Sequence, residues 1–286
     1  MSAWSAVVVS QGTRPTELAR AVGSLLAQRD VDLEVVVVGN GWEPEGLPDG
    51  VRSVHSPVNL GPPGGRNLGL AEVDAPYAFF LDDDAHLPQP DTLARLGRLF
   101  DEDPDLGVVQ TRIRTPEGDS LSRWVPRMRD KDPERASLAF YVLEGSVAVR
   151  RSVLEGSAGW AGRFFYAHEG IELAWRAWDA GFRVEYRPEL EAVHPRMHPS
   201  RHEDHLWLDG RNRVWLARRN LPAPVAVLYL LDRAGMSLAR NARSPSSARA
   251  WARGFREGLR ADAGTRRPIS WHTVWRMTRH GRPPVV

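Results

Sequence analysis

The sequence predicts an α/β fold, with a doubly wound, largely parallel sheet flanked by helices and followed by a C-terminal helical extension. Two observations support this prediction. Through most of the first 200 residues, short apolar runs alternate with amphipathic helical patterns, and such alternation is typical of a parallel sheet covered by helices. From about His205 the pattern is helical only. We therefore expect an α/β domain over residues 1–204 and a helical extension over residues 205–286.

The expected elements follow one another with short connections. Strands are predicted at residues 6–10, 33–38, 51–54, 77–81, 108–113, 139–149 and 182–186. A first helix opens near Pro15, because apolar residues recur on one face after it, and further helices are predicted at residues 66–71, 91–100 and 171–180. Residues 61–65, rich in Gly and Pro, indicate a rigid loop, and residues 114–133 a polar loop over the sheet. Prolines at positions 222, 224, 245 and 268 divide the late helices.

The composition excludes several kinds of site. The 286 residues include no Cys, so disulfides, thiolate nucleophiles and Cys-bound zinc are ruled out. The first apolar strand begins almost at once, without a basic segment and a long apolar stretch before it, and the late apolar run at residues 225–231 is too short to span a bilayer. We therefore expect a cytoplasmic protein, either free or peripherally bound at the inner face of the membrane.

Charge is distributed unevenly along the chain. Residues 201–286 hold 17 Arg and 6 acidic residues, a net charge of +11, whereas residues 1–200 hold 21 basic and 30 acidic residues, a net charge of −9. A basic extension on an acidic domain suits an anionic partner, either a phosphate-bearing polymer or an anionic membrane. An ordinary solvated helical surface explains the same composition equally well. We expect no nucleic acid as a partner.

Three consecutive carboxylates, Asp82, Asp83 and Asp84, directly follow the apolar run at residues 77–81. In an open α/β sheet, ligands bind beyond the carboxyl ends of the strands. Like charges at a strand exit repel one another unless a cation offsets them, and Mg²⁺ or Mn²⁺ takes oxygen ligands and bridges carboxylates to phosphates. The alternative is a solvated acidic turn that caps the helix starting near Asp91. The neighbouring segments decide between the two.

Other segments carry small or polar residues in a defined order. Asn40 lies in a small-residue turn after a strand, and Arg66 follows a glycine-rich stretch at an expected helix start. Backbone amides at a helix N-terminus and a guanidinium both suit a diphosphate. Glu169 and Glu172 lie at the start of a late helix, and His194 follows the last predicted strand. The order of these segments narrows the choice of function.

In this order the segments resemble those of the inverting glycosyltransferases of family 2, which have the GT-A fold. The resemblance covers about residues 5–200 and rests on Val38-Gly39-Asn40-Gly41, Asn59-Leu60-Gly61-Pro62-Pro63-Gly64-Gly65-Arg66-Asn67-Leu68-Gly69, Asp82-Asp83-Asp84 and Glu169-Gly170-Ile171-Glu172-Leu173. It implies transfer of a hexose or deoxyhexose from a nucleotide diphosphate sugar to a hydroxyl acceptor, with inversion at the anomeric carbon. The acceptor would belong to a cell-surface glycan, a lipid-linked precursor or a natural product.

The resemblance also implies roles for individual residues. Asp82 and Asp84 match the family's Asp-x-Asp, in which the first lies near the ribose and the metal and the second is the principal ligand of Mn²⁺ or Mg²⁺. His194 matches a late His that contacts the metal or a phosphate. The residues expected on the nucleotide side of the site are Asn40, Arg66, Asp82 and Asp83.

The sequence departs from the family pattern at two positions. Gly39 replaces an Asp that usually contacts the base, so recognition of uracil through that carboxylate is lost, and Asn40 is the candidate substitute. Gly170 replaces the carboxylate that normally serves as the general base. Because an inverting transfer needs a carboxylate to deprotonate the acceptor hydroxyl, the role passes to a neighbour. Glu169 is the first choice and Glu172 the second, although Glu172 also fits a structural role in the first turn of its helix.

Two other functions fit parts of the pattern. A nucleotidyltransferase or pyrophosphorylase would also place acids at a strand exit, but it needs an N-terminal loop rich in Gly, Arg and Lys, and residues 10–14 offer only Gly12 and Arg14. A catalytically inactive scaffold that binds a carbohydrate or a nucleotide is consistent with the two glycine replacements. The retained carboxylates and His194 favour the enzyme.

Overall fold

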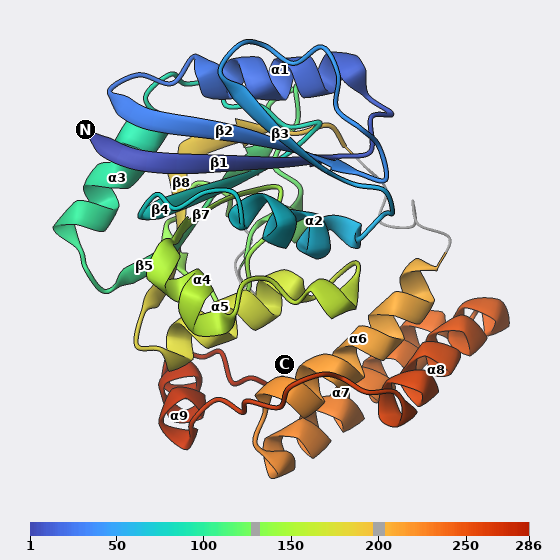
Figure 1. Cartoon of the computed structure of the whole chain (residues 1–286). Helices are drawn as coiled ribbons and strands as arrows, with labels where there is room; N and C mark the ends of the chain where they lie inside the picture. Colours follow the sequence, from blue (N-terminus) through green and yellow to red (C-terminus); the bar gives the residue numbers. More distant parts are fainter. Residues whose placement is uncertain (127–131, 197–203, 286) are drawn as a thin grey trace.

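The computed structural model, drawn in Figure 1, describes residues 1–126, 132–196 and 204–285. Its strands are β1 (Ser2–Ser10), β2 (Val31–Asn40), β3 (Val51–Ser56), β4 (Tyr77–Asp82), β5 (Leu106–Arg114), β6 (Ser137–Leu138), β7 (Ser146–Arg150) and β8 (Arg183–Val193). They form one eight-stranded sheet in the order β3-β2-β1-β4-β7-β5-β8-β6. All of these strands except β6 and β7 run in the same direction. The predicted α/β class is therefore confirmed.

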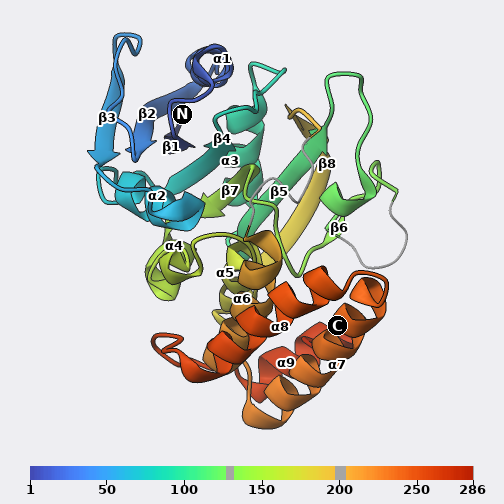
Figure 2. The same ribbon diagram turned by 90° about the vertical axis from the view of Figure 1, so that its right-hand side faces the viewer.

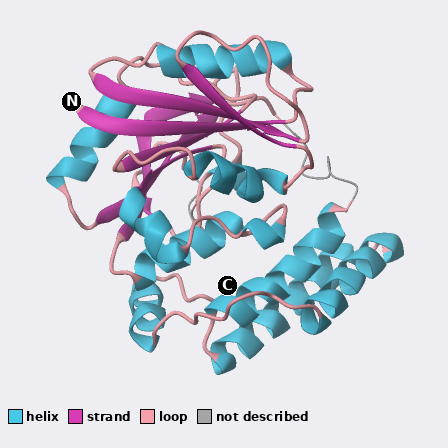
Figure 3. Cartoon of the chain, viewed as in Figure 1, coloured by secondary structure: helices cyan, strands magenta, loops and turns pink. Residues whose placement is uncertain are grey.

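Helices cover both faces of the sheet, and a further group of helices lies to one side of it (Figures 1 and 3). Those of the α/β part are α1 (Pro15–Leu26), α2 (Gly61–Leu70), α3 (Thr92–Glu102), α4 (Arg151–Ser157) and α5 (Glu169–Asp179), with short 3-10 turns η1 (Ser122–Trp124) and η2 (Gly162–Phe164). Those of the C-terminal part are α6 (His205–Asn220), α7 (Ala223–Asn241), α8 (Pro245–Arg260) and α9 (Trp271–Arg279).

Successive residues of the central strands enter two different apolar cores. Trp4 and Val8 of β1 pack in one core with residues of α1 and α3, whereas Val7 lies in the other core with residues of α4 and α5. This division follows from the strand geometry, in which neighbouring side chains point to opposite faces. Because both faces are covered, the central strands are continuous apolar runs. That is why the sequence predicts them well.

The structure corrects the prediction for residues 61–65. They are not a loop but the first turn of α2, whose two prolines lie at the start of the helix, where a missing N–H breaks no intrahelical hydrogen bond. A Cβ at Gly65 would lie 2.6 Å from Cγ1 of Val9, so the glycine lets α2 approach β1 closely. As a consequence Arg66 lies inside the helix rather than at its start.

Other boundaries also differ from the prediction. The strand expected at residues 139–149 is only β7, and it follows a turn at residues 139–145. The helix α4 was not predicted. Of the expected loop at residues 114–133, Arg114 ends β5 and η1 forms one turn, while residues 127–131 lie outside the described part.

The C-terminal helices share a core with the α/β domain. Trp215 of α6, Tyr229 of α7 and Met277 of α9 belong to the same apolar cluster as Leu173 of α5. Figure 2 shows these helices gathered beneath the α/β domain, on the side of α5. None of the helices in the described ranges is long and apolar enough to cross a membrane. A division of the chain at residue 204 remains a prediction.

Candidate active site

Polar side chains gather where four strands of the same direction end. Ser10 ends β1, Asn40 ends β2, Asp82 ends β4, and His194 follows β8. Their ends meet at one edge of the sheet, which is where α/β proteins bind ligands. Two adjoining cavities lie there, cavity A of about 220 Å³ and cavity B of about 350 Å³. The residues that line both are Pro62, Arg66, Asp82, Tyr166 and His194.

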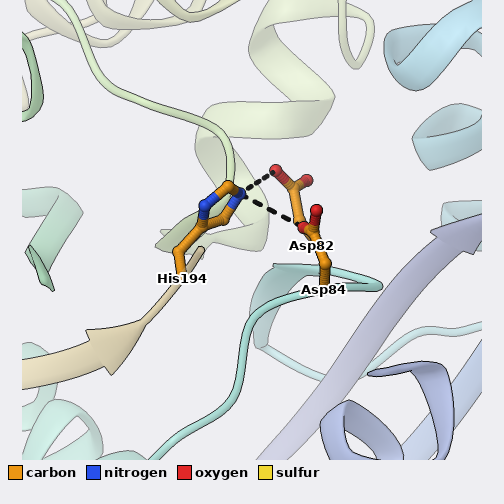
Figure 4. A group of neighbouring side chains, drawn as sticks. All are labelled: Asp82, Asp84 and His194. Carbon is orange, nitrogen blue, oxygen red and sulfur yellow. Dashed lines mark ion pairs between the residues drawn. The ribbon is translucent and has the colours of Figure 1, made fainter. Parts of the chain in front are cut away.

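Asp82, Asp84 and His194 form a cluster suited to a metal ion, and Figure 4 shows the imidazole facing both carboxylates. Nε2 of His194 lies 3.2 Å from Oδ1 of Asp84 and 3.7 Å from Oδ2 of Asp82. Its Nδ1 lies 2.7 Å from the carbonyl oxygen of Pro195. If Nδ1 carries the proton and donates to that carbonyl, Nε2 is left as the free ligand nitrogen. Two carboxylate oxygens and one imidazole nitrogen fit Mn²⁺ or Mg²⁺.

The charges around Asp82 favour its ionised form. Burial raises the pKa of Asp82, but the nearby imidazole of His194 and the guanidinium groups of Arg66 and Arg14 outweigh it and lower the pKa to about 2. The carboxylate is therefore ready to bind a cation at neutral pH.

Asp83 lies beside the metal cluster but is held by other residues. Its Oδ2 accepts a hydrogen bond of 2.7 Å from the hydroxyl of Ser10, and its Oδ1 lies 2.5 Å from Nη2 of Arg14. Arg14 also forms an ion pair with Asp84. Asp83 thus lines cavity A and fixes Arg14 there, whereas the metal cluster uses its two neighbours.

Arg66 links the two cavities from inside α2. Its Nη2 lies 3.1 Å from Oδ1 of Asp82 and its Nη1 lies 3.7 Å from Oε1 of Glu169. The guanidinium stacks 5.0 Å from the ring centre of Trp160, and the side chain is buried. A buried, permanent positive charge placed in this way suits an anionic ligand on either side.

The side chain of Asn40 organises the start of α2. It donates to Oδ1 of Asn59 at 2.9 Å and accepts from the backbone N–H of Leu60 at 2.7 Å. Gly39 beside it leaves no room for a larger residue, because a Cβ there would overlap the carbonyl oxygen of Trp42. A side chain at position 39 is therefore incompatible with the turn at residues 41–44. Asn40 lines cavity A.

Glu169 lies deep in the wall of cavity B. It is 3% exposed, and its Oε2 is buried without a hydrogen-bond partner among the described residues. Burial raises the pKa of Glu169 to about 8, with a further contribution from the charge of Glu144. Arg66 opposes this shift.

Glu172, the second candidate for the base, lies away from both cavities. Its Oε1 pairs with Arg219 at 2.7 Å, and its Oε2 accepts from Arg219 at 2.9 Å and from Asn220 at 2.6 Å. All three bonds join α5 to the end of α6. The structure therefore gives Glu172 the role of a buried ion pair between helices, and the expectation that it reaches an acceptor hydroxyl is corrected.

The sequence did not reveal three residues of the site. Arg14 and Ser10 hold the acidic triplet, and Glu144 lines cavity B beside Glu169. Glu144 is the one charged residue in an otherwise apolar stretch, immediately before Gly145, and this pattern is the sequence signal for it. The positions of Ser10 and Arg14 follow only from the pairing of β1 with β4.

The chain matches known proteins in sequence and in fold. The profile of the family described as Glycosyl transferase family 2 matches residues 5–169. The Pre-mycofactocin glycosyltransferase of Mycobacterium tuberculosis (strain CDC 1551 / Oshkosh) is 26% identical over 192 residues, which cover 63% of this chain and 38% of that protein. The chain thus spans under two-fifths of the length of that curated relative.

Two solved structures share the fold at low sequence identity. S. aureus TarS 1-349 in complex with UDP-GlcNAc has a TM-score of 0.64 and 14% identity, over 91% of this chain and 82% of that one. The mannosyltransferase PcManGT from Pyrobaculum calidifontis, in complex with GDP-Man and Mn²⁺, has a TM-score of 0.55 and 18% identity, over 99% of this chain and 85% of that one. The predicted GT-A fold is confirmed by these similarities. Since the family profile matches more than half of the sequence, the chain belongs to glycosyltransferase family 2.

Proposed function

We propose that this protein transfers a hexose or deoxyhexose from a nucleoside diphosphate sugar to a hydroxyl acceptor, with inversion at the anomeric carbon. One observation carries the proposal. Within the metal cluster, Asp82 and His194 line both cavities and Asp84 lines cavity A, so a donor in cavity A and an acceptor in cavity B would meet beside the cluster.

Cavity A has the features that a nucleoside diphosphate requires. Arg14 and Arg66 supply fixed positive charge, and Asn40, Asp82 and Asp83 supply polar groups on the same wall. The related structures support this assignment, since TarS holds UDP-GlcNAc and the mannosyltransferase holds GDP-Man. The nucleoside and the diphosphate would therefore lie in cavity A, with the sugar directed toward cavity B.

The residues present fit a divalent cation. Asp82, Asp84 and His194 offer one ligand atom each, and these atoms lie within 4.8 Å of one another. The mannosyltransferase of similar fold holds Mn²⁺. When bound, Mn²⁺ or Mg²⁺ supplies positive charge that stabilises the departing diphosphate. Asp84 keeps Oδ1 toward this cluster while Arg14 holds its other oxygen.

Cavity B has the features that an acceptor alcohol requires. Its wall combines the carboxylates Glu144 and Glu169 with the aromatic rings of Trp124 and Tyr166. Aromatic faces pack well against the apolar face of a sugar ring, and a carboxylate within hydrogen-bond reach can take the proton of the attacking hydroxyl. Such an acceptor would belong to a cell-surface glycan, a lipid-linked precursor or a natural product.

Calorimetry with nucleoside diphosphates tests the proposal. We expect one of UDP, GDP and dTDP to bind with Mn²⁺ present, and binding to fall about tenfold or more when Mn²⁺ is removed or when Asp84→Ala removes a ligand. Asp74→Ala, which removes an exposed carboxylate, is the matched control and should bind as the wild type does.

The alternative function gives a different result. An inactive scaffold that binds nucleotide would show binding without release of sugar from any nucleotide sugar. Absence of binding to all three diphosphates would overturn the proposal of a donor site in cavity A.

We also propose that α7 contacts an anionic membrane surface peripherally. Val227, Leu228, Leu231 and Leu238 are all more than half exposed, and their spacing places them along one side of the helix. Exposed Arg side chains follow at positions 240 and 243. An exposed apolar stripe next to basic residues is typical of helices that lie in the membrane interface, and it agrees with the charge of +11 over residues 201–286.

A further inference from the structure

We infer that Glu144 is the carboxylate that takes the proton of the acceptor hydroxyl, and that Glu169 is a positioning residue behind it. This inference rests on the proposed transfer function, and it assigns the general base to a residue outside the Glu169-Gly170 pair. Three observations of the structure support it.

The first observation is that Glu144 and Gly170 share one space at the start of α5. The backbone N–H of Gly170 donates to Oε1 of Glu144 at 2.6 Å. A Cβ at position 170 would overlap that same oxygen and the carbonyl oxygen of Val142. A carboxylate from the turn before β7 therefore occupies the place that a side chain at position 170 would need. The glycine makes room for Glu144.

The second observation concerns access to the acceptor. Glu144 lines cavity B and is partly exposed. Its hydrogen bond from Gly170 uses Oε1, and among the described residues no other residue donates a hydrogen bond to Oε2. In Glu169 the corresponding Oε2 is fully buried and Oε1 faces Arg66. Glu172 is held by three hydrogen bonds from α6. Glu144 is thus the carboxylate of these three that offers an accessible oxygen.

The third observation is that Glu144 is fixed relative to the metal cluster. The carbonyl oxygen of Gly145 accepts from the backbone N–H of Asp82 at 3.1 Å, and that of Glu144 lies 3.5 Å from Nη2 of Arg66. Ser146, which follows Gly145, is the first residue of β7, and β7 pairs with β4. The turn that carries Glu144 is therefore fixed to the end of β4, where Asp82 lies, and a general base needs such fixed placement.

Glu169 and the start of α5 influence the charge and the surroundings of the Glu144 carboxylate. The positive end of the helix dipole lies where Gly170 donates to Glu144 and stabilises an ionised carboxylate there. Burial, and to a lesser extent the nearby charge of Asp82, favour the protonated carboxyl instead and raise the pKa of Glu144. Glu169 holds Arg66 at 3.7 Å, and Arg66 in turn lies between the two glutamates and Asp82.

The transfer step balances with Glu144 as the base. The acceptor O–H bond breaks and its proton passes to Oε2 of Glu144, while the oxygen forms a bond to the anomeric carbon of the donor sugar. The bond from that carbon to the diphosphate oxygen breaks, and its electron pair leaves with the nucleoside diphosphate. The proton on Glu144 is then released to water through cavity B.

Turnover of nucleotide sugars by the full chain tests the inference. UDP-GlcNAc, UDP-glucose and GDP-mannose are supplied with Mn²⁺, and water, methanol and p-nitrophenyl glycosides serve as acceptors. We expect Glu144→Gln to bind the nucleotide diphosphate within about threefold of the wild type while turnover falls about 100-fold or more. Glu144→Gln keeps an oxygen to accept from Gly170, so its fold should be retained. Glu155→Gln, on the exposed side of α4, is the matched control.

Chemical rescue distinguishes a base from a structural residue. In Glu144→Ala, added formate should restore turnover, because it can enter the space of the lost carboxylate and accept the proton. Turnover of Glu144→Gln within about threefold of the wild type, or no rescue of Glu144→Ala by formate, would overturn the assignment of Glu144 while leaving the transferase function intact. Absence of Mn²⁺-dependent nucleotide binding by the wild type would instead overturn the proposed function, and the inference with it.

Discussion

At two positions of this site, Gly39 and Gly170, neighbouring chain segments occupy the space that a larger side chain would need. At position 39 the turn after β2 fills the space of a side chain, and at position 170 the carboxylate of Glu144 does so. Both positions are those at which this chain departs from the pattern of its family. At both positions a side chain would therefore collide with a neighbouring segment. At position 170 the space is occupied by the carboxylate of Glu144.

The packing at position 170 predicts a cost for a single methyl group. Gly170→Ala should lower the free energy of unfolding by about 1–3 kcal/mol, because the new Cβ overlaps two oxygens and forces Glu144 or the backbone to move. Urea unfolding measures the change. The matched control is Gly156→Ala in α4, where a Cβ meets nothing within 4 Å and the substitution should stabilise by up to about 1 kcal/mol. Equal effects of the two substitutions would contradict the close packing of Glu144 on Gly170.

The buried carboxyl of Glu169 predicts a pH dependence of stability. Burial raises its pKa from 4.5 to about 8, so the folded chain binds this proton more tightly than the unfolded chain. Its stabilising contribution is therefore present at low pH and is lost as the pH rises from about 4.5 through about 8. In EDTA, the unfolding free energy of the wild type should fall relative to that of Glu169→Gln across this range. Two parallel curves would show that folding leaves the pKa of Glu169 unchanged.

At the scale of elements, α5 and α6 are joined by a buried ion pair. Glu172 is 5% exposed and receives two hydrogen bonds from Arg219 and one from Asn220. Removing one partner of such a pair leaves the other charge without compensation. Glu172→Ala should therefore lower the unfolding free energy by about 3 kcal/mol and leave nucleotide binding unchanged. Glu155→Ala removes an exposed pair and should cost less than about 1 kcal/mol. Loss of nucleotide binding in folded Glu172→Ala would instead place Glu172 in the site.

The elements that the sequence predicts well are those with a strong local pattern. The apolar central strands and the carboxylates at the end of β4 are predicted from the sequence alone. Asp82, Asp84 and His194 lie close together in the structure. The start of α2 was missed because its glycines serve contact with β1, which local propensity does not show. The role of Glu172 depends on Arg219, which is 47 positions away in the chain. Glu144 lies in a turn whose course is set by the strands on either side.

At the scale of the whole molecule, the positive charge of the C-terminal part has two uses. Several of its Arg side chains bond within the molecule, as Arg219 does with Glu172 and as Arg218 does with the carbonyl oxygens of Gly258 and Ala261. These bonds hold the C-terminal helices together and against the α/β domain. The Arg side chains at positions 240 and 243, at and just after the end of α7, remain exposed on the surface.

This arrangement predicts that one side of the molecule binds anionic vesicles. Co-sedimentation with phosphatidylglycerol vesicles should be stronger than with phosphatidylcholine vesicles, and salt should weaken it. Replacing Leu228 and Leu231 together by Glu should reduce binding about tenfold or more, since two exposed apolar side chains and the local charge are altered. Leu26→Glu is the matched control, because Leu26 is also exposed but ends α1, on the opposite side of the molecule from α7 (Figure 1).

Light scattering in the absence of lipid tests whether a second copy of the chain covers the apolar stripe of α7. A monomer that binds anionic vesicles through Leu228 and Leu231 agrees with membrane contact. A dimer that the same double substitution dissociates would mean that a second copy of the chain covers α7, and it would overturn the membrane proposal. Equal loss of vesicle binding in Leu26→Glu would also overturn it, because the apolar stripe of α7 would then have no special part in the contact.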